Sequence, residues 1–208
     1  MTEDFDYDRL LDLLAQASVD LQSIPYRPFV SALSEFAKAF AYFGLALNFA
    51  FDDIAAKASI IISNFQDVGK FQDLQSMIRD EINKGIEREN SKEYISTARS
   101  LLRLLWFMDF LTKVLELVFA DPEAHLATLV RHAYELTLAS HHSLGLRTAA
   151  RIAIRYVPDT NAFMAQMLGE GKTWDQYKTQ LTQLITRISP LRESLWGFYH
   201  DNSLEDLP

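Results

Sequence analysis

Two segments place charged side chains on helix stripes that are otherwise apolar. In the first, FDDIAAKASIIISNF (residues 51–65), Asp53 and Lys57 stand four positions apart. At ~100° per residue they share a stripe with Phe49 and Ile60, so their neighbours are large apolar side chains. The simpler interpretation is an ordinary i, i+4 ion pair at the margin of an amphipathic helix, which stabilises by only ~0.2–0.5 kcal/mol.

The second segment, RSLLRLLWFMDFL, puts Arg99 and Arg103 on one helix face, followed by Trp106 and Phe110. Like charges at this spacing repel each other, and an anion between them would relieve the repulsion. The planar fork of arginine donors fits phosphate oxygens. The alternative is a solvated arginine pair, or a pair neutralised by carboxylates of a neighbouring helix.

A histidine also lies on an apolar stripe. In AYELTLASHHSLGL, His142 shares a helix face with Leu138 and Leu146. A lone histidine on such a face is more often a satisfied core residue than a ligand. We expect the adjacent His141 to turn outward by ~100°, into solvent. The histidines are scattered and show no metal-ligand spacing, so we predict neither a metal site nor a cofactor.

If these stripes face one another, they form a site with a charged head and an apolar tail. The three basic side chains suit a phosphate. Asp53 could then accept hydrogen bonds from an amide N–H or a hydroxyl, and His142 could donate to a carbonyl oxygen. A phosphate next to an amide with long hydrocarbon chains describes ceramide-1-phosphate. The residues therefore suggest this ligand before any relative is considered.

The elements that must position these side chains are all predicted to be α-helices, because no run shows alternating, β-branched strand character. We interpret residues 1–208 as a single all-α domain. The expected helices cover residues 2–22, residues 29–65 with a bend or break near Gly44, residues 71–84, residues 90–119, a helix from Pro122 through the histidine pair, a helix from the break at 143–145 to Tyr156, a helix from Pro158 to the GEGK turn, and a last helix from Thr173 to about Pro190.

Three of these helix starts rest on capping patterns. Asn90 and Glu93 in NSKE resemble a capping box, and Thr173 with Gln176 repeats the pattern. Asp121 is placed to cap a helix whose first turn holds a proline.

The overall composition limits the class of protein. The chain is 49% hydrophobic, which is ample for one sizeable core. It has no cysteine, which fits a reducing compartment, and a net charge of -8, which argues against nonspecific nucleic-acid binding. The acidic start lacks the features of a signal peptide, and no run reaches ~18 apolar residues. We expect a soluble cytoplasmic protein.

Three motifs in this order resemble the glycolipid transfer protein superfamily, and within it the ceramide-1-phosphate transfer branch. DIAAK matches an Asp-x-x-x-Lys motif, RSLLR matches an Arg-x-x-x-Arg motif, and AYELTLASHHSL matches an Ala-Tyr-Glu…His block. RYVPDTNAFMAQML is similar to the segment that follows, so the resemblance runs over roughly residues 28–168. It implies a two-layer, all-α sandwich of about eight helices that encloses one lipid.

The resemblance also implies roles for individual residues. Asp53 would bind the ceramide amide and a nearby hydroxyl, and His142 the acyl amide oxygen. Lys57, Arg99 and Arg103 would hold the phosphate. Glycolipid-specific members of the family carry Asn in place of Lys57 and Trp in place of Arg103, so the residues present favour phosphate over sugar. The stripes and the resemblance together predict a chain pocket lined by Phe49, Ile60, Trp106, Phe110, Leu138 and Phe163.

The chain departs from the family at the segment that docks on membranes. Many members have a Trp two residues after the ligand histidine, where this sequence has Leu144, and Ser143 replaces the usual Gly. Arg147, Arg151 and Arg155 form a basic stripe that could meet anionic headgroups. The alternative is a solvated helix face.

We therefore expect a monomeric carrier, peripheral at membranes, that moves ceramide-1-phosphate between them. An enzyme is not expected, because no nucleophile–base or metal constellation emerges. Two alternatives remain: a lipid-gated sensor or adaptor with the same ligand, and a helical scaffold with no ligand.

Overall fold

The protein is helical throughout the part of the chain that the computed structural model describes, which is residues 5–40, 48–68 and 70–208, with side chains for all of these except residues 40, 48–51, 67 and 68. The prediction of an all-α protein is confirmed. The α-helices are α1 (Tyr7–Ala17), α2 (Tyr26–Phe40), α3 (Asn48–Val68), α4 (Leu74–Lys84), α5 (Thr97–Ala120), α6 (Leu126–Leu136), α7 (Leu144–Ala153), α8 (Thr160–Leu168) and α9 (Trp174–Asp201), with short 3-10 helices η3 (Ala139–His141) and η4 (Ile154–Tyr156).

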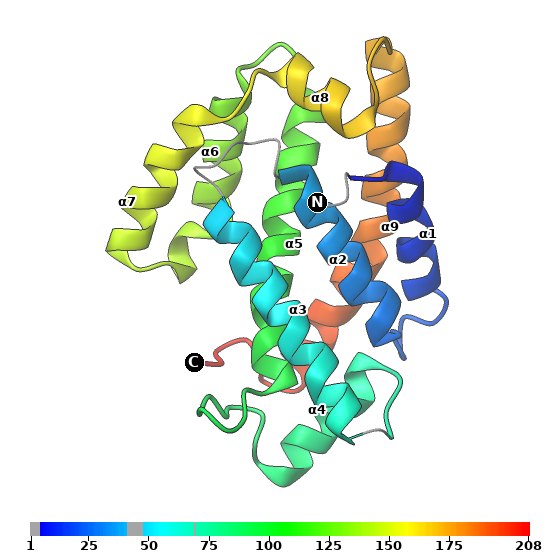
Figure 1. The fold of residues 1–208 in the computed structure, drawn as a ribbon, viewed down its shortest axis with the longest axis vertical. Coiled ribbons are helices and arrows are strands. Elements are labelled where there is room, and N and C mark those ends of the chain that lie inside the picture. Colours follow the sequence, from blue (N-terminus) through cyan, green and yellow to red (C-terminus); the bar gives the residue numbers. More distant parts are fainter. Residues whose placement is uncertain (1–4, 41–47, 69) are drawn as a thin grey trace.

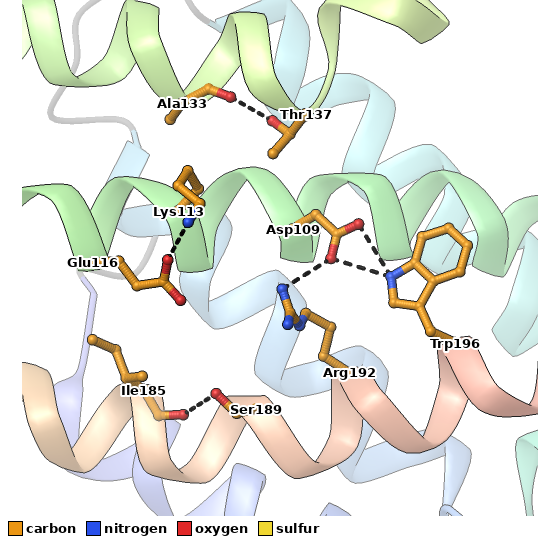
Figure 2. Close-up of polar contacts among 9 residues, drawn as sticks. All are labelled: Asp109, Lys113, Glu116, Ala133, Thr137, Ile185, Ser189, Arg192 and Trp196. Atoms are coloured by element: carbon orange, nitrogen blue, oxygen red, sulfur yellow. Dashed lines mark hydrogen bonds and ion pairs between the residues drawn. The ribbon is translucent and has the colours of Figure 1, made fainter.

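The helices pack in two layers (Figure 1). Along the chain, α1 contacts α2 and α2 contacts α3, which makes one layer. In the other layer α5 lies between α6 and α9, as Figure 2 shows. The layers meet where α3 packs on α5 and α1 packs on α9. The two-layer sandwich expected from the resemblance is therefore confirmed.

The contact between α5 and α9 includes a polar cluster that Figure 2 shows in detail. The Asp109 carboxylate on α5 accepts a hydrogen bond from Trp196 Nε1 at 3.1 Å to each oxygen, and one from Arg192 Nη1 at 3.4 Å. Burial raises the pKa of Asp109 above its ordinary value, while the Trp196 and Arg192 donors lower it. The cluster fixes the register of the two longest helices.

This contact explains why α9 does not end near Pro190, as the sequence predicted, but continues to Asp201. Leu191, Leu195 and Tyr199 are fully buried, so stopping the helix would expose core side chains. Pro190 lies inside α9 and lacks an N–H, so the helix is without one backbone donor there. At the preceding residue, the Ser189 hydroxyl donates to the Ile185 carbonyl at 2.8 Å (Figure 2).

Two predicted helix starts are correct because the capping chemistry is local. Asp159 caps α8 by accepting from the Ala162 N–H at 2.9 Å. Thr173 and Gln176 form the predicted capping box at the start of α9.

Two other predicted starts are wrong. The NSKE segment does not open α5, which begins at Thr97 with Ser96 as its N-cap. Asp121 does not cap α6 but lies at the end of α5, and α6 begins after His125. The first helix, α1, begins after Asp6, whose side chain accepts a hydrogen bond from the Arg9 N–H. The predicted break at Gly44 lies outside the described residues.

The start of α5 is set by a carboxylate from another helix, which local sequence could not reveal. Glu81 on α4 is 1% exposed and accepts hydrogen bonds from the backbone N–H groups of Thr97 at 2.6 Å and Ala98 at 2.9 Å. The Tyr94 hydroxyl also donates to it, at 2.6 Å. Burial raises the pKa of Glu81, and these donors lower it in part. Negative charge at a helix N-terminus also complements the helix dipole.

We predict that Glu81→Ala destabilises the fold by about 2–4 kcal/mol, because it leaves two backbone N–H groups and one hydroxyl buried without an acceptor. Urea unfolding followed by circular dichroism would measure the change. A matched control is Glu116→Ala, which removes a half-exposed ion pair with Lys113 and is expected to cost less than about 0.5 kcal/mol. Equal effects of the two substitutions would contradict the assigned role of Glu81.

Candidate functional site

A cavity of about 270 Å³ opens between α3, α5 and the connection from α6 to α7. It brings together four of the five side chains that the sequence singled out for the head of the site: Asp53, Lys57, Arg103 and His142. The complete lining is Asp53, Ile54, Lys57, Arg103, Leu104, Trp106, Phe107, Leu138, His141, His142 and Leu146.

From α3, Asp53 and Lys57 reach the cavity one turn apart. Lys57 Nζ donates to Asp53 Oδ1 at 3.0 Å, with 62% of the Asp53 side chain exposed and 22% of the Lys57 side chain exposed. A pair this exposed contributes little to stability. Its two groups are therefore free to exchange partners with a ligand at small cost.

From α5, Arg103 contributes a guanidinium that is only partly paired. Nη2 donates to the Leu207 carbonyl at 3.4 Å, while Nη1 is buried and has no hydrogen-bond partner among the described residues. Burial and the neighbouring charge of Arg99 lower the pKa of Arg103, and Asp53 and Tyr199 raise it. A buried positive charge next to another positive charge is stabilised when an anion enters the site.

Arg99 lies one turn before Arg103 on α5 and is not part of the cavity lining. Its Nη1 donates to Asn90 Oδ1 at 2.9 Å, while its Nε is buried without a partner among the described residues. Asn90, which the sequence placed in a capping box, therefore holds this arginine instead.

The His142 imidazole is held from both of its neighbouring helices. The Tyr134 hydroxyl of α6 lies 3.0 Å from His142 Nδ1, and Arg147 Nε of α7 donates to the His142 carbonyl at 2.9 Å. Burial lowers the pKa of His142, and so do His141 and Arg147, while Asp53 raises it. The ring is therefore neutral near pH 7. In the tautomer in which Nδ1 accepts from the Tyr134 hydroxyl, the ring proton lies on Nε2, where it can be donated to a ligand.

His141 is exposed, as predicted, but it does more than face solvent. Its ring stacks on the Trp106 indole, with centroids 3.8 Å apart and planes inclined by 10°, and it lines the cavity. The prediction assumed ~100° per residue, whereas residues 139–141 form a 3-10 helix and His142 is extended. Nothing in the sequence marks the His141–Trp106 contact.

Of the six side chains predicted to line a chain pocket, Trp106 and Leu138 line this cavity. Phe110 and Phe163 are buried in the core and Ile60 is half-buried, all outside the cavity lining. Phe49 lies outside the residues whose side chains the structure describes.

Sequence reasoning missed three apolar lining residues, because it followed single stripes and a cavity spans adjacent ones. These are Ile54, Leu104 and Phe107, whereas Leu146, which also lines the cavity, was placed on the stripe of His142.

Metal-binding clusters and membrane-spanning helices are both absent from the described ranges. No group of three or more His, Asp or Glu residues in them is placed to hold a metal ion. Likewise, none of the helices described is long and apolar enough to cross a membrane.

Known proteins share this architecture. Ceramide-1-phosphate transfer protein from Mus musculus is 25% identical over 213 residues, which cover 99% of this chain and 98% of the relative. Glycolipid transfer protein 2 from Arabidopsis thaliana is 24% identical over 177 residues, which cover 83% of this chain and 76% of the relative.

Among solved structures, human ceramide-1-phosphate transfer protein in complex with 12:0 ceramide-1-phosphate superposes with a TM-score of 0.88 at 21% identity, covering 98% of this chain and 100% of that one. This likeness establishes the fold. Proteins of this fold family are lipid transfer proteins, not enzymes. The Glycolipid transfer protein (GLTP) profile matches residues 24–169, which is most of the sequence, and the chain therefore belongs to the glycolipid transfer protein family.

Proposed function

We propose that this protein binds ceramide-1-phosphate or a close phosphosphingolipid and carries it between membranes. The observation that supports this most directly is the incompletely paired positive charge of Arg103, which lines the cavity, and of Arg99, one turn before it on α5. Arg99 Nε and Arg103 Nη1 are buried without partners among the described residues, and leaving buried donors unsatisfied costs free energy. A phosphate brings about two negative charges and three strong acceptor oxygens, so it compensates both the charge and the missing hydrogen bonds.

The residue types favour phosphate over sugar. A sugar ring needs an open aromatic face and neutral hydrogen-bond partners. The Trp106 indole in the lining already contacts the Arg103 guanidinium and the His141 ring. Positions 57 and 103 hold fixed positive charges. A glycosylceramide would therefore have to displace existing contacts and leave the cations unpaired.

The other two side chains of the head fit a ceramide amide. Asp53 is exposed at the cavity and can accept from an amide N–H or a hydroxyl. The neutral His142 ring can donate to the acyl carbonyl. An acceptor from α3 and a donor from the connection between α6 and α7 match the two polar groups of one amide.

The hydrocarbon chains need more room than the cavity offers. Its volume, about 270 Å³, is below the ~300–1,000 Å³ of pockets for drug-sized ligands. About one turn further along α5, the two layers meet in an apolar seam with free space of only about 10 Å³. The seam is lined by Leu14, Phe29, Ala32, Leu33, Phe36, Met108, Leu111 and Ile188. We infer that chain binding moves α1 and α2 apart from α5 and α9.

This arrangement suits transfer rather than permanent capture. Each buried methylene is worth ~0.8 kcal/mol against water, but a bilayer already supplies most of that. The net preference for the protein can stay small, so that headgroup contacts decide which lipid is carried.

We also propose that α7 and η4 touch the membrane beside the cavity. Leu144, Ile152 and Tyr156 are 73%, 50% and 70% exposed. Such side chains are costly in water and stable in the interface of a bilayer. In the basic stripe, Arg151 forms a bidentate pair with Glu135 and Arg147 bonds the His142 carbonyl. This leaves Arg155 as the member best placed for anionic headgroups.

The composition, without cysteine, supports a cytoplasmic location. Contact with membranes would then be peripheral and transient.

We predict that the protein transfers fluorescent ceramide-1-phosphate between vesicles at least about tenfold faster than a glycosylceramide, and that Arg103→Ala removes most of this preference because one charge-assisted bond is lost. Arg187→Ala, at an exposed arginine of α9, is the matched control and should transfer normally. Faster glycosylceramide transfer would contradict the phosphate site. Tight binding with slow transfer would favour a sensor over a carrier, and neither binding nor transfer would favour a scaffold.

For the membrane face, we predict that Leu144→Asp lowers vesicle association and transfer rate about three- to tenfold, because burying a leucine side chain is worth up to ~2 kcal/mol. Leu144→Trp should increase association. Val19→Asp is the matched control, since Val19 is 82% exposed and lies after α1. Binding of a short-chain, water-soluble ceramide-1-phosphate should be unchanged by Leu144→Asp; equal losses in both assays would place Leu144 in the binding site instead.

A further inference from the structure

We propose that Trp106, braced by His141, is a positioning residue that holds the Arg103 guanidinium ready for phosphate. The inference rests on the proposed function and extends it to two side chains of the same site. The family resemblance gave Trp106 a place only in the chain pocket and gave His141 no role.

The first step is the state of the Arg103 side chain. Arg103 Cζ lies 4.1 Å from the centroid of the Trp106 ring. Its Nη2 is engaged by the Leu207 carbonyl, and Nη1 has no partner among the described residues. A face and one edge of the guanidinium are therefore fixed, and one edge remains for a ligand. Arginine carries about 2 kcal/mol of rotamer entropy, so fixing it beforehand favours binding.

The second step is why this position holds a tryptophan. Trp106 Nε1 is buried and has no hydrogen-bond partner among the described residues, although buried indole N–H groups usually find one. A leucine or phenylalanine would fill apolar space without that cost. Tryptophan is the best aromatic partner for a cation, and the contact with Arg103, three residues before it on α5, uses this property.

The third step is what holds the indole. The His141 ring stacks on it at 3.8 Å and 10°. His141 comes from η3 and directly precedes His142, whose carbonyl and ring are fixed by Arg147 and Tyr134. His141, which supports Arg103 through Trp106, and His142, the proposed amide-binding residue, are therefore neighbours in one short segment. A movement of η3 would disturb both halves of the headgroup site together.

A double-mutant cycle tests the proposal, with dissociation constants for short-chain ceramide-1-phosphate and for the matching uncharged ceramide. Trp106→Leu should weaken phosphate binding about three- to tenfold and ceramide binding less than about twofold. In an Arg103→Ala background, Trp106→Leu should change phosphate binding by less than about twofold. An equal loss in both backgrounds, or for both ligands, would overturn the proposal and make Trp106 a wall of the cavity.

Conservative variants separate the bracing role of His141 from general damage. His141→Ala should weaken phosphate binding, and His141→Phe, which keeps a stacking ring, should restore most of the loss; failure of Phe to rescue would overturn the bracing role. Trp106→Phe serves if the leucine variant does not fold. Trp174→Leu, the same change at a half-buried tryptophan that contacts Tyr177, controls for the loss of an indole.

The outcomes for the two proposals differ. No binding of ceramide-1-phosphate by the unmodified protein would refute the proposed function. Normal binding that depends on Arg103 but not on Trp106 would refute only the positioning role.

Discussion

The position of α5 is the constraint on which the site depends, and a buried carboxylate sets it. Glu81 binds the first N–H groups of α5, and the Tyr199 hydroxyl from α9 donates to the Ala98 carbonyl at 2.6 Å. Arg103, Trp106 and Phe107 of the cavity lining follow on this helix within ten residues of its start. A shift of one residue in the start of α5 would rotate its side chains by ~100° and turn Arg103 away from the cavity.

Features that depend on local chemistry could be predicted from the sequence, and features that depend on distant partners could not. The Thr173 capping box was predicted correctly because its partners are three residues apart. The start of α5 was not, because Glu81 is 16 positions from Thr97. For the same reason Pro190 was a misleading stop signal: the leucines that α9 buries around it outweigh the missing N–H.

The predictions for the candidate site show the same difference between local and distant features. Helical spacing predicted that Asp53 and Lys57 share a face and reach one place with Arg103, which holds within regular helices. It did not predict that the exposed His141 stacks on Trp106, because the chain leaves the α-helix for η3 there and the ~100° rule no longer applies. Functional side chains in short irregular links are the ones that sequence periodicity cannot place.

The clustering of positive charge at the candidate site carries an electrostatic cost, and this property is useful to a carrier. Two arginines one turn apart keep buried, unpaired N–H groups, and burial and Arg99 lower the pKa of Arg103. Removing that penalty is a gain that only an anionic headgroup can provide, whereas the hydrocarbon chains gain nearly as much from any bilayer. In the function that we propose, selectivity and reversibility can therefore coexist: the charged head decides which lipid leaves the membrane, and the small difference between bilayer and protein for the chains lets it return.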